Sequence, residues 1–217
     1  MSIEKNLHTI KESLPQGVSL VAISKTKSNE EILEAYNAGQ RVFGENKIQE
    51  MSDKWAQLPK DIEWHMVGHV QRNKVKYMAE FVSLIHAVDS LKLLKEINKQ
   101  AKKHDRVVNC LLQMKIAEED TKFGITLDEV ESILTSETYR AMENVRVTGL
   151  MGMATLTEDR QKIKSEFETL KTAFHKLQQA HDLNVLSMGM SGDYEIALEC
   201  GSNMVRIGSA IFGERNY

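Results

Sequence analysis

The chain has 217 residues, of which 41% are hydrophobic and 27% are charged, and its formal net charge is −3. This length supports one substantial hydrophobic core, so we expect residues 1–217 to form a single domain. The slightly acidic charge argues against a nucleic-acid-binding protein, which usually presents a basic face. The lysines are scattered over helical segments, as is typical of solvent-exposed helix faces.

Cysteine usage and hydropathy indicate a cytoplasmic protein. The two cysteines, Cys110 and Cys200, lie among apolar or small residues, which favours buried free thiols over a disulfide, and their spacing fits no metal site. The first 14 residues contain no unbroken apolar run, so no signal peptide is expected. No segment is apolar and long enough to suggest a membrane span.

Amphipathic stretches alternate with short apolar runs along the whole chain. The first amphipathic stretch places Ile3, Leu7, Ile10 and Leu14 on one helical face, and Pro15 ends that predicted helix. Eight apolar runs are predicted strands, and they cover residues 18–24, 41–45, 62–68, 84–90, 107–116, 145–153, 184–190 and 204–213.

Helical patterns fill the segments between the predicted strands. Ser28 and Glu31 have the spacing of a capping box, which predicts a helix that ends at Gly39. Two shorter helices are expected over residues 127–134 and 193–201. The remaining helices are expected to bury Ile48, Met51, Trp55 and Leu58; Val70, Tyr77, Met78 and Phe81; Leu91, Leu94 and Ile97; and Ile163, Phe167, Leu170, Phe174 and Leu177.

Eight nearly continuous apolar strands separated by helices predict a parallel sheet that is covered on both faces. Eight such units favour an α/β fold of the single-domain TIM-type (β/α)8 barrel class over the alternative, an open doubly wound sheet. The eighth predicted strand has no helix after it. The extra N-terminal helix is therefore left to complete the outer ring.

Two segments that contain glycine and serine lie at the seventh and eighth predicted strands, one just after the seventh strand and one within the eighth. In parallel barrels, functional groups gather at the carboxyl ends of the strands. Residues 191–193 lead into a predicted helix and residues 208–210 lie beside them in the eighth predicted strand, so their backbone amides predict a site for a phosphate. Ordinary helix capping by Ser191 and Ser209 is the alternative.

A lysine, Lys25, follows the first predicted strand, at the mouth of the predicted barrel. Such a lysine can be solvated, bind a phosphate as a point charge, or form a Schiff base. Burial at an inward position lowers the pKa of an amine and makes it nucleophilic. A nucleophilic lysine beside a phosphate site favours pyridoxal 5'-phosphate (PLP) as cofactor. A sugar-phosphate aldolase would share both features, but its preparation would be colourless.

Several motifs give the chain a resemblance to a known family. Residues 21–50 (VAISKTKSNEEILEAYNAGQRVFGENKIQE) and the later segments EWHMVGHVQRNK, IHAVDS, DTKFGI, GLMGM, LSMGMSGDYEIAL and GSNMVRIGSAIFGERNY resemble those of the pyridoxal phosphate homeostasis proteins. The resemblance extends over nearly the whole chain in the same order. It implies a barrel of PLP fold type III, like the N-terminal barrel of alanine racemase. SGD at residues 191–193 replaces the commoner SDD, where backbone amides matter more than the side chain.

The resemblance also implies a PLP site, with no metal and no catalytic residue. Lys25 would form the internal aldimine, and Arg206 would face the pyridine nitrogen. The remaining contacts would come from Ser191, Gly208 and Ser209 at the phosphate with Met190 nearby, from Asn46 and His65 in the ring pocket, and from Met66 and Met151 as apolar neighbours.

The residues alone leave other interpretations open for three of these positions or their neighbours. His65 can be a core histidine that bonds to a backbone carbonyl, or it can contact the ligand. Asn46 can equally cap the helix that begins beside it. Glu45 is expected to be a salt-bridge partner at the mouth of the barrel rather than a catalytic acid.

An arginine at the ring nitrogen disfavours catalysis. The guanidinium of Arg206 is always protonated and donates to an unprotonated nitrogen, so the ring withdraws electrons less strongly than a pyridinium and carbanion chemistry becomes harder. Racemases of this fold use a second base, a tyrosine from an additional β domain of the partner subunit. Only residues 214–217 follow the eighth predicted run here, so two-base racemisation is not expected.

The implied function is therefore a PLP-binding protein and not an enzyme. It would hold PLP on Lys25 and act in intracellular vitamin B6 homeostasis, with indirect effects on amino acid and keto acid balance; a weak PLP-dependent racemase or lyase is the alternative. The expected partners are PLP and PLP-dependent apo-enzymes that receive it, with no nucleic acid and no membrane, and a monomer is expected. Lys122 is a candidate secondary cation or transient aldehyde acceptor, or a solvated loop lysine.

Overall fold

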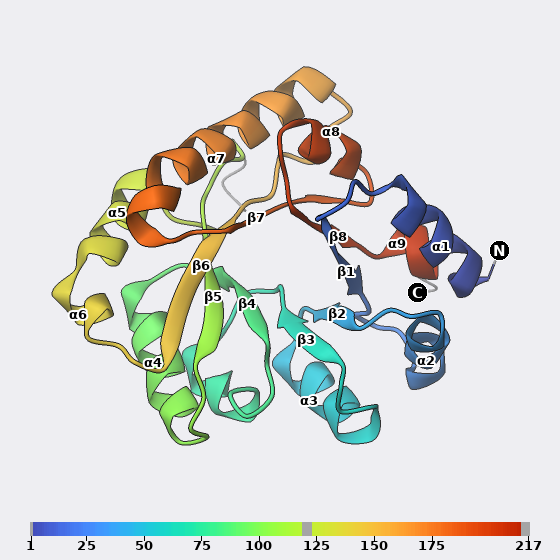
Figure 1. The fold of residues 1–217 in the computed structure, drawn as a ribbon, viewed down its shortest axis with the longest axis horizontal. Coiled ribbons are helices and arrows are strands. Elements are labelled where there is room, and N and C mark those ends of the chain that lie inside the picture. The colour runs from blue at the N-terminus through green and yellow to red at the C-terminus, as the bar shows by residue number, and fades with distance from the viewer. Residues whose placement is uncertain (1, 119–122, 214–217) are drawn as a thin grey trace.

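The computed structural model describes residues 2–118 and 123–213, and its centre is a closed barrel of parallel strands (Figure 1). The strands follow one another round the barrel in chain order, and β1 pairs with β8 to close it. This confirms the predicted (β/α)8 barrel and excludes the open sheet. The strands are β1 (Ser19–Ile23), β2 (Val42–Glu45), β3 (Glu63–Met66), β4 (Leu84–Val88), β5 (Val108–Gln113), β6 (Val145–Met151), β7 (Val185–Met190) and β8 (Met204–Ile207).

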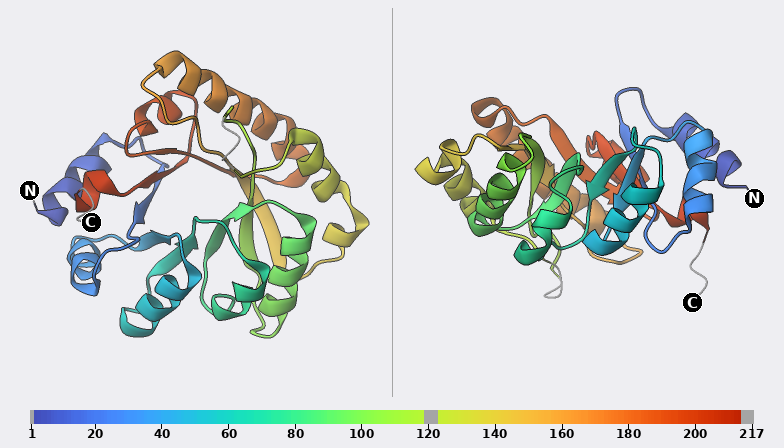
Figure 2. Two further views of the ribbon diagram at one scale, coloured as in Figure 1. Left: turned by 180° about the vertical axis from the view of Figure 1, so that it is seen from behind. Right: turned by 90° about the horizontal axis from the view of Figure 1, so that it is seen from below.

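Helices surround the barrel, as two further views show (Figure 2). The helices are α1 (Ile3–Ser13), α2 (Asn29–Asn37), α3 (Ile48–Gln57), the 3₁₀-helix η1 (Arg72–Tyr77), α4 (Leu91–Lys102), α5 (Leu127–Thr135), α6 (Glu137–Arg140), α7 (Arg160–His181), α8 (Tyr194–Glu199) and α9 (Ser209–Phe212). Most of them cover the outer face of the strands with their apolar side, because the outward-facing residues of a parallel barrel need a second layer, while α1 and α6 pack mainly against other helices.

The start and end of α2 follow from its sequence. The Ser28 hydroxyl accepts a hydrogen bond from the backbone of Glu31, and the Glu31 carboxylate accepts one from the backbone of Ser28, which completes the predicted capping box. Gly39 ends the helix with a φ of +87°, a conformation that glycine adopts without steric cost. The helix thus begins and ends where the sequence predicts.

The segment after β3 differs from its prediction. Instead of an α-helix that spans residues 70–81, the chain forms the short 3₁₀-helix η1 and a series of turns. Tyr77, which was expected to face the core, is 48% exposed and packs against the side-chain nitrogens of Lys74 and Lys76. The apolar residues that are buried here are Val70, Val75, Met78, Ala79 and Val82. The predicted burial of Val70 and Met78 is thus confirmed, whereas the helical spacing that included Tyr77 was wrong.

The end of the chain also differs from its prediction. β8 ends at Ile207, and the following residues form the short helix α9 rather than a continuation of the strand. The eighth strand therefore does have a helix after it. The N-terminal helix α1 packs against both α9 and α2, so it completes the outer ring beside α9 rather than in its place (Figure 1).

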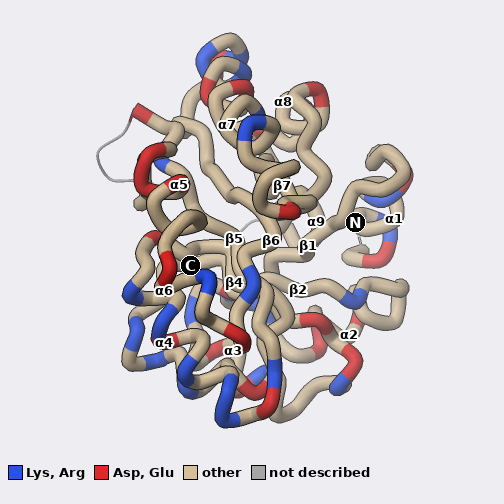
Figure 3. The backbone as a smooth tube through the Cα atoms, turned by 60° about the vertical axis from the view of Figure 1, so that its left-hand side comes forward, with Lys and Arg blue, Asp and Glu red and all other residues tan. Residues whose placement is uncertain are grey.

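Two hydrophobic clusters form the core. The larger one lies between the strands and the helices. The smaller one consists mainly of strand residues and fills the barrel interior: Val21, Leu84, Ala87, Leu111, Met151 and Met204. Cys110 and Cys200 are buried free thiols, as predicted. Charged residues gather on the outer helices (Figure 3), and among the described residues no helix is long and apolar enough to cross a bilayer.

A glycine in β6 provides a test of the barrel packing. A Cβ on Gly149 would lie 1.8 Å from the carbonyl oxygen of Val185 in β7, so β6 and β7 would have to separate. We expect Gly149→Ala to lower the free energy of unfolding by about 1–3 kcal/mol, measured by urea denaturation. Gly192→Ala is the matched control, because nothing lies within 4 Å of a Cβ there. Equal stability of the two variants would contradict this packing.

Candidate functional site

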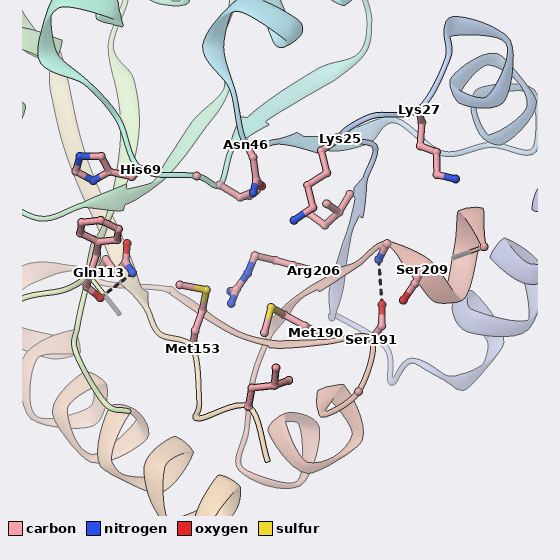
Figure 4. Close-up of a pocket in the computed structure, with 18 residues that line it drawn as sticks. Lys25, Lys27, Asn46, His69, Gln113, Met153, Met190, Ser191, Arg206 and Ser209 are labelled. Atoms are coloured by element: carbon pink, nitrogen blue, oxygen red, sulfur yellow. Dashed lines mark hydrogen bonds between the residues drawn. The ribbon is translucent and has the colours of Figure 1, made fainter. Parts of the chain in front are cut away.

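A cavity of about 590 Å³ opens at the carboxyl ends of the barrel strands (Figure 4). Its wall contains seven of the ten residues that the sequence singled out: Lys25, Asn46, Met190, Ser191, Arg206, Gly208 and Ser209. These residues come from both ends of the chain and meet because β1 pairs with β2 on one side and β8 on the other. The cavity size falls in the range of small-molecule sites.

The other three expected residues are buried but do not line the cavity. Met151 belongs to the small cluster inside the barrel, and His65 lies in the interior with 5% of its surface exposed. Met66 follows His65 directly in β3, so it points to the opposite face and packs in the outer layer. Strand alternation thus separates two neighbours that the resemblance places at one site.

The loops after β7 and β8 form one end of the cavity. The Gly208 amide donates to the Ser191 hydroxyl at 3.2 Å, which joins the two loops. By contrast, the amides of Ser191, Gly192 and Ser209 find no acceptor among the described residues, and each of these residues lines the cavity. Backbone amides usually need an acceptor. This end of the cavity therefore offers several unsatisfied donors together with two serine hydroxyls.

Lys25 is held at the adjoining wall, after β1, by a tight turn. The turn is closed by a hydrogen bond of 3.0 Å from the Lys27 amide to the Ser24 carbonyl. Thr26 adopts a φ of +64°, which is uncommon for a residue with a Cβ, and its amide donates to Glu50 at 2.6 Å. Figure 4 shows the amine of Lys25 directed into the cavity, toward the region between Asn46 and Arg206.

A buried ion pair lies behind this turn. Lys54 Nζ donates to the Ser24 carbonyl at 2.8 Å, to Glu45 at 2.8 Å and to Glu50 at 2.7 Å. Burial raises the pKa of the Glu45 carboxyl, while the Lys54 ammonium and the Ser24 hydroxyl oppose that shift. Glu45 is thus a salt-bridge partner, as the sequence predicted, although it is fully buried rather than at the mouth of the barrel.

The floor of the cavity carries a polar network that the sequence did not reveal. Arg206 donates to the Ser187 hydroxyl at 2.6 Å, and the same hydroxyl lies 3.1 Å from His86 Nδ1. His86 Nε2 in turn lies 3.0 Å from His65 Nδ1. Burial lowers the pKa of His65 to about 3 and that of His86 well below its ordinary value, and it lowers the pKa of Arg206 to about 10. At neutral pH both imidazoles are therefore uncharged and the guanidinium is charged.

The bonding of His65 differs from both interpretations of the sequence. Its Nδ1 atom bonds to another histidine, His86, and not to a backbone carbonyl or to a group that lines the cavity. Gly192, whose amide the sequence placed at the predicted phosphate site, also lines the cavity. The rest of the cavity wall comes from residues that were not among the predicted site residues: Ile23, Lys27, Val67, Gly68, His69, Gln113, Phe123, Met153, Leu156 and Gly213. The rings of His69 and Phe123 stack with centroids 4.6 Å apart.

A signal for part of this wall was present in the sequence. Gly68 ends the third predicted strand and His69 follows it, at the end where functional residues gather. A Cβ on Gly68 would lie 2.4 Å from the Asn46 carbonyl oxygen, so glycine permits the close approach of these two loops. Lys122, the candidate secondary cation, lies outside the described residues. Within the described residues, no cluster of metal-binding side chains occurs.

The barrel, the lysine after β1 and the donor-rich loops after β7 and β8 define a protein of the alanine racemase N-terminal domain class. Residues 1–216 match the family model described as "Alanine racemase, N-terminal domain". Alanine racemase of Clostridium difficile has the same fold, with a TM-score of 0.80 at 14% identity, and the match covers 100% of this chain and 57% of that chain.

Closer relatives identify the family within this class. The chain is 36% identical over 233 residues to the pyridoxal phosphate homeostasis protein of Pasteurella multocida, covering 100% of this chain and 99% of that protein. It is 36% identical to the Escherichia coli protein of that name, covering 94% and 88%. The structure of PipY from Synechococcus elongatus with PLP bound superimposes with a TM-score of 0.88 at 33% identity, covering 97% and 100%. The chain belongs to the family of pyridoxal phosphate homeostasis proteins.

The Glu45–Lys54 pair provides a second prediction. Lys54→Met would leave the Glu45 carboxyl buried without its cation, at a cost of about 3–5 kcal/mol in the free energy of unfolding at pH 7.5. The raised pKa of that carboxyl means that the loss appears as pH rises through the pKa of the folded state, so the variant should recover stability toward pH 5. Urea denaturation at both pH values measures this. The double variant Lys54→Met with Glu45→Gln should remove the pH dependence, and an unchanged pH dependence would contradict the assignment.

The buried histidines provide a third prediction. Their pKa values are lower in the folded state than the ordinary value of about 6.5, so the unfolded chain binds more protons and stability falls as pH drops below 6.5. Each histidine contributes up to about 1.4 kcal/mol per pH unit. Urea denaturation between pH 6 and 4 gives the free energy of unfolding as a function of pH. Its slope against pH should be shallower in His86→Gln than in wild type by about that amount. Identical slopes would contradict it.

Proposed function

We propose that this chain binds PLP, holds it as a Schiff base on Lys25 Nζ, and serves PLP homeostasis as a carrier. The observation that carries the proposal is the arrangement of one cavity, with the Lys25 amine on one wall and unsatisfied backbone donors on another. A cofactor with an aldehyde and a phosphate matches these two walls chemically. The names of the relatives and the PLP-bound state of PipY support the same proposal.

The phosphate of PLP would occupy the end of the cavity between the loops after β7 and β8. Ser191 and Ser209 would supply hydroxyls, and the amides of Ser191, Gly192 and Ser209 would supply further donors. Glycine at position 208 permits the close approach of this loop to β1, because a Cβ there would lie 3.2 Å from Ile23. Its own amide is bonded to Ser191, so we assign Gly208 the role of holding the loops together and not of a direct donor.

The ring of PLP would lie above the floor of the barrel. The Arg206 guanidinium would donate to the ring nitrogen, with Asn46 and Met190 beside the ring. His65 and Met151 would support the residues of the cavity wall from beneath without lining the cavity. Met66, in the outer layer, would support β3. When bound, PLP supplies an electrophilic aldehyde; the protein supplies the amine, the donors and a partly enclosed space.

A carrier role fits the cavity better than amino acid turnover does. A charged guanidinium donates to the ring nitrogen without protonating it, which limits the electron-withdrawing power of the ring. Among the described residues that line the cavity there is no tyrosine and no carboxylate, and His69 is the only imidazole. A weak racemase would need a second base, and among the described lining residues His69 is the only imidazole, whereas a lyase would need only the Lys25 amine. A broad assay for changes in amino acid chirality and for keto acid release distinguishes the two functions.

The proposal also covers the domain organisation, oligomeric state, location and recipients of the protein. We propose one domain over residues 1–217, because the described strands and helices surround one barrel. We propose a monomer, since the large exposed apolar residues of the described chain are few and scattered: Tyr77, Val107, Phe123 and Leu156. A cytoplasmic location and PLP-dependent apo-enzymes as recipients complete the proposal, with indirect effects on amino acid and keto acid balance.

A fourth prediction tests the covalent attachment. Purified wild-type protein supplied with PLP should show a visible absorption band, and borohydride should fix a PLP adduct that mass spectrometry locates on Lys25. Lys25→Ala should lose the fixed adduct because the only change is the loss of the attacking amine. Unfolding by urea should show that the variant is folded.

Lys27→Ala is the matched control for this experiment. Lys27 also lines the cavity, but its Nζ donates to the Phe212 carbonyl at 3.0 Å and pairs with Glu31 at 3.3 Å. This variant should keep the adduct on Lys25. An adduct fixed on Lys27 in the wild type, or none at all, would overturn the proposed attachment.

A further inference from the structure

The floor of the cavity contains a chain of four buried polar side chains that extends away from the proposed cofactor position. Arg206 lies at the cavity, followed by Ser187, His86 and His65 at successive donor–acceptor distances of 2.6, 3.1 and 3.0 Å. Each side chain comes from a different strand: β8, β7, β4 and β3. Each is at most 5% exposed. Barrel interiors are usually filled by branched apolar side chains, so this polar chain calls for a functional reason.

The Ser187 hydroxyl fixes the direction of every hydrogen bond in the chain. Arg206 can only donate, so the Ser187 oxygen accepts from it. The hydroxyl has one proton, and His86 Nδ1 is its one other partner among the described residues. If His86 Nδ1 carried a proton, the Ser187 proton would be buried without an acceptor, at a cost of about 1–3 kcal/mol. The hydroxyl therefore donates to His86 Nδ1.

The same logic assigns both imidazole tautomers. With Nδ1 as acceptor, neutral His86 carries its proton on Nε2 and donates it to His65 Nδ1. His65 is then the Nε2–H tautomer as well. Every donor thus points the same way, from Arg206 to Ser187, from Ser187 to His86 and from His86 to His65. A second bond, from Arg206 Nη2 to the Gly152 carbonyl at 3.0 Å, holds the other side of the guanidinium.

We propose that Ser187 and His86, together with His65, form a one-directional hydrogen-bond relay that positions the Arg206 guanidinium in the cavity. The relay turns the lone pairs of the Ser187 oxygen toward Arg206 Nη1, and the Gly152 carbonyl accepts from Nη2, so both terminal nitrogens of the guanidinium are held where Arg206 lines the cavity. This inference deepens the proposed function and rests on it, because the group that Arg206 would meet there is the ring nitrogen of PLP. Ser187 and His86 are positioning residues that do not line the cavity themselves.

The tautomers can be tested without cofactor. Protein labelled with ¹⁵N at histidine gives two-bond ¹H–¹⁵N correlations that distinguish Nδ1–H, Nε2–H and the imidazolium. At pH 7 we expect Nε2–H for both His86 and His65, assigned by the loss of each signal in His86→Gln and His65→Gln. An Nδ1–H tautomer or an imidazolium at His86 would overturn the relay.

The positioning role is tested by the rate at which PLP leaves. After loading, release into excess apo-enzyme or a chemical aldehyde trap is followed by absorbance. Ser187→Ala and His86→Leu should release PLP about 10-fold faster than wild type or more, as is typical when a supporting residue is removed. His86→Gln keeps one acceptor and one donor, so it should stay within about threefold of wild type. Circular dichroism and urea unfolding identify any variant that fails to fold.

The outcomes separate this inference from the proposed function. If wild-type protein takes no covalent adduct on Lys25, the proposed function fails. If the adduct forms but Ser187→Ala and His86→Leu release PLP at the wild-type rate, the positioning role fails and the proposed function stands. If His86→Gln accelerates release as much as His86→Leu does, packing rather than the direction of hydrogen bonding supports Arg206, and the relay is also rejected.

Discussion

The pairing of β1 with β8 is the contact on which the site depends. It places Val21 opposite Arg206 and Ala22 opposite Ile207. Because parallel strands end at the same edge of the barrel, the turn that carries Lys25 then lies beside the loop of Gly208 and Ser209. Residues about 180 positions apart in the sequence thus meet as the two walls of one cavity. A sheet left open between β1 and β8 would have the same side chains and no site.

The barrel interior shows how stability and function are balanced. Part of it is apolar, with Val21, Leu111 and Met204 in one cluster, and the polar chain from Arg206 to His65 lies next to this cluster. Buried polar groups are costly unless they are bonded to each other. Here hydrogen bonds link each member to the next, so the network fixes one arrangement instead of leaving unsatisfied charges. Behind the Lys25 turn, Lys54 likewise neutralises the buried Glu45 carboxylate, although the Oε2 atom of Glu45 has no hydrogen-bond partner among the described residues.

Local signals in the sequence predicted the elements that depend on local chemistry. The capping box at Ser28 and the apolar spacing in α7 are such cases. The helix predicted over residues 70–81 was wrong because the apolar residues of this segment fit more than one spacing. Only the packing against the barrel shows which of them reach the core. His86 was missed for a similar reason, since its partner Ser187 is 101 positions away. Met66 was expected in the ring pocket, but the alternation of side chains along β3 turns it away from the cavity. Predicting this requires the register of β3 in the barrel, which a similarity between sequences does not give.

Reversible holding places particular demands on this arrangement. A Schiff base on Lys25 can be hydrolysed when water enters the cavity, so the lifetime of the proposed complex depends on how long the non-covalent contacts retain PLP for reattachment. Those contacts lie at the two ends of the cofactor, at the serine and glycine loops and at Arg206. The guanidinium contributes fully only if its orientation is already set before PLP arrives, because a freely rotating side chain loses about 2 kcal/mol of rotamer entropy on binding. Ser187, His86 and His65 do not line the cavity, but they orient Arg206 before PLP arrives. The relay can therefore set the residence time of PLP although most of the residues in the relay never touch it.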